Sequence, residues 1–182
     1  LNETQHHQTR HILGIRRIEQ EKYVWMDRFT SRNLELFYSQ NEGAITLIDV
    51  LDETKSAMGG RMLRRWLALP LKDEKQISKR HQIVEELVAS NEISQTLSNE
   101  ISNIGDLERL ISKVATLRIN PRECGKLKEA LTALKPIKEV CEKSAVKPLK
   151  DIASRIDICD KIRTKIETEL SENPPMLLHK GN

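Results

Sequence analysis

The sequence predicts a mainly α fold, a multi-helical bundle of long, lever-like helices with a small β element near the N-terminus. Apolar residues recur three and four positions apart through most of the chain after residue 43, which is the period of an amphipathic helix. Pro, Asn and Gly fall at short intervals between these stretches and indicate helix ends. All six aromatic residues lie within the first 66 positions, where the composition is more typical of strands.

The composition is that of a folded chain without an obvious nucleic-acid surface. Of the 182 residues, 38% are hydrophobic and 31% charged, enough for a buried core and too apolar for a disordered chain. The 30 basic and 27 acidic residues leave a formal net charge of only +3, weak for a dedicated DNA-binding module. Cys124, Cys141 and Cys159 show no C-x-x-C spacing, so we expect free thiols in a reducing compartment. With no secretory h-region and no apolar run near ~18 residues, we expect a cytoplasmic protein.

The β element is expected in the aromatic region. Residues 23–26 (Y-V-W-M) and 33–37 (N-L-E-L-F) show alternation around a polar T-S-R, which predicts two short strands or a strand pair. Residues 1–18 show no clear period. Asn41-Glu42-Gly43 then predicts a loop.

Helical spacing begins after that loop. A short helix carries Leu47, Ile48 and Leu51 and breaks near Gly59-Gly60, and a second carries Leu63, Trp66 and Leu67 and stops at Pro70. Asp73, with Gln76 three residues on, predicts the N-cap of a helix that runs through residue 88.

The second half of the chain predicts longer helices. An apolar stripe spans residues 97–117, about three heptads. Asn120-Pro121-Arg122-Glu123 places a capping Asn, a Pro at the first helical position and a Glu at the third, and the helix that follows is expected to be interrupted at Pro136. A last helix of about twenty residues, roughly 30 Å long, is expected over residues 152–170 and ends before Pro174.

The stretch Gly59-Gly60-Arg61 raises the question of a phosphate site. It lacks the G-x-x-x-x-G-K-[ST] pattern of a phosphate loop, so a close-packing glycine turn is favoured. Arg61 and Arg65 share a helix face and, with Arg64, offer either phosphate contacts or ion pairs. Pairing with Asp52, Glu53 or the carboxylates of a neighbouring helix is the favoured reading in a nearly neutral chain.

Other candidate chemistry is sparse. His7 and His11 lie four apart near His6 and Glu3, a spacing that can hold zinc, but no third ligand is apparent downstream and we do not expect a metal site. Acidic pairs beside Arg109 and Arg80 indicate surface ion pairing on helices rather than an acid–base dyad; these pairs are Asp106 with Glu108 and Glu85 with Glu86. No nucleophile–base arrangement is apparent, so neither a catalytic nor a cofactor-binding residue is predicted in this chain.

Five blocks in order carry a resemblance to a known family. They are T-S-R-N-L-E-L from Thr30, D-E-T-K-S-A-M-G-G-R-M-L-R-R-W-L-A-L-P-L from Asp52, G-D-L-E-R-L-I-S-K-V-A from Gly105, N-P-R-E from Asn120 and E-N-P-P-M-L-L from Glu172. Together they resemble the helical core, or lever, region of the bacterial MutS family of DNA mismatch-recognition proteins. The likeness spans nearly the whole chain. Gly60 stands where Ala or Ser is common in that family, and Ser31 where Arg is frequent.

The resemblance assigns an architectural role to the residues in these blocks. Met58 and Gly59 would begin a core helix, with Trp66 and Leu63 as core anchors. The implied core motif consists of Leu34, Leu36, Met58, Gly59, Leu63, Trp66 and Leu67. Arg61, Arg64 and Arg65 would serve interdomain or phosphate contacts.

For the whole protein, the resemblance implies a dimeric, DNA-dependent ATPase that binds mispaired double-stranded DNA and recruits downstream repair factors. Residues 1–22 would end a connector domain, and residues 23–182 would form the first segment of the core, stopping before a DNA clamp. ATP and Mg²⁺ would bind in other domains, so this segment would be no enzyme by itself. Two alternatives stay open: a free-standing helical nucleic-acid-binding module, and a protein-interaction scaffold unrelated to DNA.

Overall fold

The structure is a computed structural model that describes residues 20–175. Over this range the chain is helical and contains no β-strand, which confirms the mainly α class. A 3-10 turn, η1 (Gln20–Lys22), precedes the helices. These are α1 (Arg28–Asn33), α2 (Leu47–Leu51), α3 (Ala57–Ala68), α4 (Glu74–Ala89), α5 (Asn91–Ile104), α6 (Leu107–Ala115), α7 (Pro121–Lys143), α8 (Lys147–Ala153) and α9 (Asp160–Glu169). None of these helices is long and apolar enough to cross a membrane.

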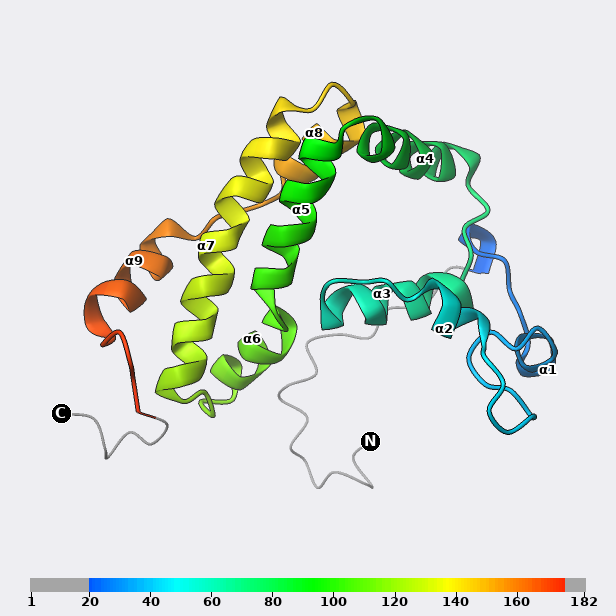
Figure 1. The fold of residues 1–182 in the computed structure, drawn as a ribbon, viewed down its shortest axis with the longest axis horizontal. Helices are drawn as coiled ribbons and strands as arrows, with labels where there is room; N and C mark the ends of the chain where they lie inside the picture. Colours follow the sequence, from blue (N-terminus) through cyan, green and yellow to red (C-terminus); the bar gives the residue numbers. More distant parts are fainter. Residues whose placement is uncertain (1–19, 176–182) are drawn as a thin grey trace.

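The centre of the fold is an antiparallel pair formed by α5 and α7, which lie side by side (Figure 1). The 23 residues of α7 give it a length of about 34 Å. Small side chains on α7 and α8 let the backbones approach closely, and larger apolar ones fill the remaining space. The buried cluster consists of Leu97, Ile104, Ala130, Ala133, Ile137, Cys141, Leu149 and Ala153.

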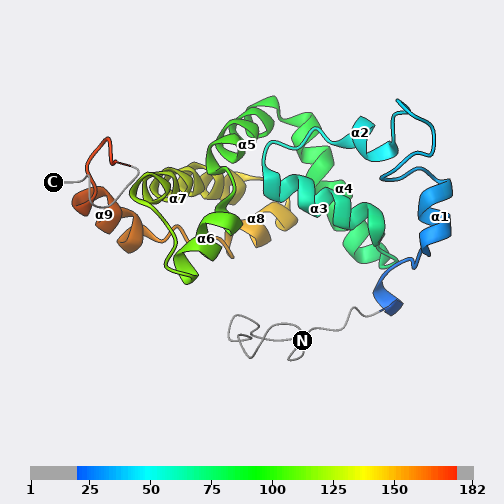
Figure 2. The same cartoon turned by 90° about the horizontal axis from the view of Figure 1, so that it is seen from below.

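The other helices divide between this pair and a separate N-terminal layer. α4 and α8 pack near one end of the pair, while α6 and α9 pack along α7 (Figures 1 and 2). The N-terminal layer, defined as α1, α2 and α3, lies to one side, and α3 is not among the helices in extensive contact with the pair. Its own small core is formed by Leu36 and Ile48, whose backbones are joined by a 3.1 Å hydrogen bond.

The prediction of a small β element is wrong for the described residues. The first predicted strand is an extended segment that makes one isolated antiparallel bridge, from Tyr23 to Leu71. The second, residues 33–37, is a turn: α1 ends at Asn33, after Asp27 has capped it by accepting a hydrogen bond from the Thr30 amide at 2.6 Å, and Glu35 then adopts a φ of 47°. Two short strands with no third partner are marginal in water, whereas this local cap forms without one.

Two predicted long helices are each divided in the structure. The stripe over residues 97–117 passes through Gly105, whose φ of +64° ends α5, and Asp106 then caps α6. The stripe over residues 152–170 is broken after Ala153, and Cys159 adopts a left-handed φ of 49° before α9 begins. Across the first break the apolar spacing continues because Leu107 of α6 packs against the same core cluster as α5; no residue of α9 belongs to that cluster.

Predictions that depended on local capping chemistry are confirmed. Asp73 accepts hydrogen bonds from the amides of Lys75 and Gln76 and caps α4. Asn120 and Glu123 form a reciprocal capping box at the start of α7. The expected interruption at Pro136 is wrong, because α7 continues to Lys143. Packing of α7 against α5 and α8 offsets the backbone hydrogen bond that proline cannot donate.

Candidate functional site

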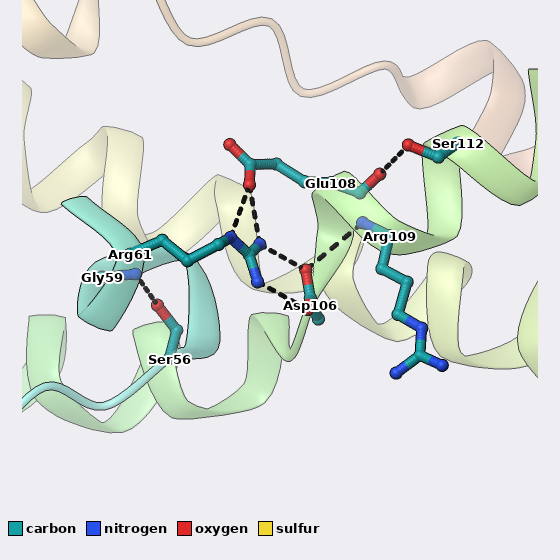
Figure 3. Close-up of polar contacts among 7 residues, drawn as sticks. All are labelled: Ser56, Gly59, Arg61, Asp106, Glu108, Arg109 and Ser112. Atoms are coloured by element: carbon teal, nitrogen blue, oxygen red, sulfur yellow. Dashed lines mark hydrogen bonds and ion pairs between the residues drawn. The ribbon is translucent and has the colours of Figure 1, made fainter. Parts of the chain in front are cut away.

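The candidate site is the contact between α3 and α6, which is built around Arg61 (Figure 3). Its guanidinium donates from Nη1 and Nη2 to the two carboxylate oxygens of Asp106 at 3.0 and 2.7 Å. Nε and Nη2 also donate to Oε2 of Glu108 at 3.1 and 2.6 Å. One arginine therefore binds carboxylates 45 and 47 residues away in sequence and joins two helices, through the planar geometry in which paired hydrogen bonds are strongest.

Local backbone chemistry places both sides of this contact. On α3, Ser56 caps the helix by accepting from the Gly59 amide at 3.1 Å, which fixes the turn from which Arg61 projects (Figure 3). On α6, the Asp106 carboxylate also accepts from the Arg109 amide at 3.2 Å. The same carboxylate thus caps α6 and binds Arg61, so the α6 backbone helps to fix its orientation toward α3.

The charges stabilise one another while remaining accessible to water. The hydrogen bonds from Arg61 hold the pKa of the Asp106 carboxyl below its ordinary value. Reciprocally, hydrogen bonds to Asp106 and then Glu108 raise the pKa of Arg61. The side chains of Arg61, Asp106 and Glu108 are 49%, 26% and 68% exposed, so dissolved ions reach the contact and weaken it.

The other two candidate arginines do not join Arg61 in a common phosphate site. The pKa of Asp52 is lowered first by hydrogen bonds from Thr54 and, to a smaller extent, by the charge of Arg64, which places Arg64 near the end of α2. Arg65 is exposed and forms no ion pair with a described residue. The three arginines therefore serve different surroundings, and the favoured reading of structural pairing is confirmed for Arg61 alone.

Trp66 and Leu63, the predicted core anchors of α3, are not fully buried by the described residues. Trp66 is 42% exposed, and Leu63 is only partly buried. The indole instead carries a cation–π contact with Arg80 of α4, whose guanidinium carbon lies 3.6 Å from the ring centroid. Trp66 is therefore not enclosed by the described residues, because α3 lies outside the main bundle; it joins α3 to α4.

The remaining motif residues have mixed surroundings. Leu36 is buried, at 6% exposure, whereas Leu34 is 57% exposed and lies beyond the end of α1. Met58 is partly buried against the core cluster of the α5–α7 pair. Gly59 lies inside the first turn of α3 rather than at a break, and Leu67 is partly buried. The motif is therefore divided between a buried part and a face that the described chain leaves open.

A cavity of about 500 Å³ beside this contact has no net preference for an anion. Its charged lining consists of Asp106, Arg109, Lys113, Glu123, Lys126 and Glu129, which balance in sign. Lys113 and Glu123 are moreover paired with each other. Within residues 20–175, no group of three or more His, Cys, Asp or Glu side chains is placed to hold a metal ion. His6, His7 and His11 lie outside the described residues.

The described cysteines are free, as predicted. Burial raises the pKa of the Cys141 thiol, and burial followed by the charge of Glu123 raises that of Cys124. Higher pKa values leave less thiolate at neutral pH, so these side chains are poor nucleophiles.

Sequence reasoning missed which carboxylates Arg61 binds. Local spacing predicts that Asp106 and Glu108 pair with Arg109, because partners 45 positions apart leave no trace in it. It also missed Glu86, which accepts hydrogen bonds from the Ser144 hydroxyl and the Ala145 amide and joins α4 to the turn before α8. The burial of Ser144, at 2% exposure, shows how closely that turn is held.

These features define a helical scaffold whose charged side chains join helices across the fold. The chain belongs to the MutS family, since residues 29–182 match the family model of MutS domain III. It is 52% identical over 182 residues to the DNA mismatch repair protein MutS of Flavobacterium psychrophilum, and 51% over 181 residues to that of Christiangramia forsetii. The MutS protein of Bacteroides fragilis is 45% identical over 181 residues. All of the chain is covered in these matches, but it spans only 21% of the length of each relative.

Proposed function

We propose that this chain is the core, or lever, segment of a protein that recognises mispaired DNA and starts mismatch repair. The observation that carries the proposal is the match of residues 29–182 to MutS domain III, together with relatives that are named DNA mismatch repair proteins. We further propose that residues 1–22 end a connector domain and that residues 23–182 begin the core. In this assignment ATP, Mg²⁺ and the mispaired duplex bind other domains, so the segment itself is not an enzyme.

The mechanical part of the proposal rests on how the helices are joined. The α5–α7 pair is held by a continuous apolar cluster, which resists bending along its length. Charged contacts then fix its ends to neighbouring elements, as Glu86 does at the turn before α8 and Lys113 does with Glu123. A displacement at one end of such a pair is transmitted to the other, which is what coupling between an ATPase domain and a DNA clamp needs.

Direct DNA binding by Arg61, Arg64 and Arg65 is the less favoured function. Arg61 is already bound to two carboxylates, and the chain has little excess positive charge. The chain alone should bind matched and single-mismatch duplexes equally weakly, and physiological salt should abolish that binding. Tight binding that is lost when the three arginines are neutralised would instead support the arginine-dependent alternative.

The intact protein should act in the cytoplasm as a dimer with downstream repair factors. A chimera tests the lever assignment: residues 1–182 replace the matching segment of the Flavobacterium psychrophilum MutS. We expect this chimera to lower the mutation frequency of a strain that lacks MutS. A folded, expressed chimera that leaves the mutation frequency high would contradict the assignment.

A matched pair of substitutions on α7 tests the mechanical role. Thr132 is exposed and lies in the middle of the helix. In the purified chimera, Thr132→Pro should leave basal ATPase activity intact and abolish its response to mismatched DNA, because a second proline one turn before Pro136 removes another backbone hydrogen bond and kinks the lever. Thr132→Ala preserves the helix and should retain the response. Equal responses from the two variants would show that a continuous α7 is not required.

A further inference from the structure

The N-terminal layer is attached to the rest of the fold by few contacts. Met58 packs against the core cluster, and Trp66 stacks on Arg80 of α4. The chain connection is the five-residue link 69–73 between α3 and α4. A further attachment is the Arg61 contact with α6, which lies away from that link along the helix (Figures 1 and 3). The orientation of α3 thus depends on what holds its N-terminal half.

The Arg61 contact has the properties of a joint that opens and closes. Both of its carboxylates lie at the start of α6, so all four hydrogen bonds are lost together when α3 moves away. Asp106 also accepts a capping hydrogen bond from the Arg109 amide, in which Arg61 takes no part. Opening therefore leaves α6 capped and exposes only charged groups, which water can solvate.

We propose that Arg61, Asp106 and Glu108 form a reversible latch between the N-terminal layer and the α5–α7 pair. In the closed state α3 moves with α6 as one body. In the open state α3 turns about the link 69–73 and is guided by Met58, by the Trp66–Arg80 stack and by the backbone hydrogen bonds that pair the link with residues 22–24. Two discrete arrangements of this kind are what a coupling element needs. The use of the latch in a DNA-repair lever rests on the proposed function, whereas its existence in this chain does not.

Electron–electron distance spectroscopy on the full 182-residue chain tests the latch. Spin labels at Met62→Cys on α3 and Lys135→Cys on α7 occupy exposed positions, in a background in which the three native cysteines are replaced by Ala. A second pair at Asn99→Cys and Lys135→Cys reports the α5–α7 distance. That second distance must stay unchanged for a variant to be interpreted, because it shows that the bundle is intact.

The latch predicts a specific set of distance changes at low salt. Arg61→Gln should add a second, longer α3–α7 population, whereas Arg65→Gln, one turn along the same helix, should not. The double change Asp106→Asn with Glu108→Gln should add the same population, since Asn still caps α6. Raising the salt concentration should populate the longer distance in the parent chain and have little effect on Arg61→Gln.

Restoring an ion pair in reverse provides the decisive comparison. Arg61→Glu should open the latch, and combining it with Asp106→Asn and Glu108→Arg should return the distance distribution to the closed form. An identical single α3–α7 distance in the parent chain and in Arg61→Gln at every salt concentration would overturn the latch. It would show instead that the packing of Met58 fixes the orientation of α3. That result would leave the proposed function intact, because the chimera's mutation frequency is measured independently.

Discussion

The attachment of α8 offers the sharpest test of the packing. Leu149 is 3% exposed and belongs to the core cluster between α7 and α8. Leu149→Ala removes three buried carbon atoms, a loss of about 2.4 kcal/mol at ~0.8 kcal/mol for each methylene-sized group. The cavity left behind adds to that loss, because α8 is also held by buried Pro148 and Ala153 and cannot collapse fully. We expect a total destabilisation of about 3–4 kcal/mol.

Urea denaturation followed by far-UV circular dichroism measures this loss. The urea concentration at the midpoint should fall, while the slope of the unfolding free energy against urea concentration stays unchanged. The variant lowers the stability of the folded state but does not change how much surface unfolding exposes. For a chain of this size the melting temperature should fall by roughly 6–16 °C, at about 2–4 °C for each kcal/mol.

Val88→Ala provides the matched control for this experiment. Val88 lies on α4 and is 81% exposed, so its replacement should change stability by less than about 0.5 kcal/mol. If Leu149→Ala stays within about 1 kcal/mol of the parent chain, or if Val88→Ala costs as much, the assignment of the core to the α7–α8 contact is refuted.

Three further predictions concern helix ends. Asn120→Ala should lower the stability measured by urea denaturation by about 0.5–2 kcal/mol, whereas Asn120→Ser should retain most of it, because Ser still accepts a capping hydrogen bond. Gly60→Ala should raise the melting temperature, since the added Cβ meets only movable side-chain ends at 3.3 Å or more. Gly59→Ala should raise it less, because the added Cβ meets the capping Ser56 hydroxyl at 3.3 Å. The pKa of Asp73 is held below its ordinary value of 3.8, first by the side-chain hydrogen bond from Gln76. The ionised Asp73 carboxylate therefore stabilises the folded chain at pH values above 3.8, and this stabilisation is lost as the pH falls through the folded-state pKa. Thermal melts between neutral pH and about pH 3 should show this loss, and Asp73→Asn should reduce the decline.

Local chemistry explains why some elements were predictable. The caps at Asp73 and Asn120 use partners two or three residues away, so the sequence alone contains both halves of each interaction. The breaks at Gly105 and after Ala153 were not predictable from apolar spacing, because that spacing reports which face is buried and not whether the helix is continuous. A glycine followed by a capping Asp is the signal that marks the first break.

The candidate site was predictable only on one side. The sequence indicated that Arg61 would pair with carboxylates, since three arginines in a nearly neutral chain need partners. It did not indicate Asp106 and Glu108, because the choice depends on how α3 lies against α6 in the folded chain. The exposure of Trp66 was not predictable for a related reason. A large aromatic residue in an apolar helical stripe suggests a core position, but the sequence does not show whether another element packs over that stripe.

The placement of apolar and charged contacts has a mechanical consequence. Along the α5–α7 pair the contacts are apolar and close-packed, so they resist deformation and depend little on salt. Where other elements meet this pair, charged or polar contacts accompany the apolar ones, as in the Arg61 latch, the Glu86 contact with Ser144, and the hydrogen bond from Lys138 Nζ to the Ile156 carbonyl at 3.0 Å. Charged contacts exchange with water at small net cost, so these joints can change arrangement while the pair stays rigid. Salt should therefore change the orientation of the N-terminal layer at concentrations that leave the helical content of the bundle unchanged. A salt titration in which the orientation and the helical content change together would show that the chain moves as one body instead.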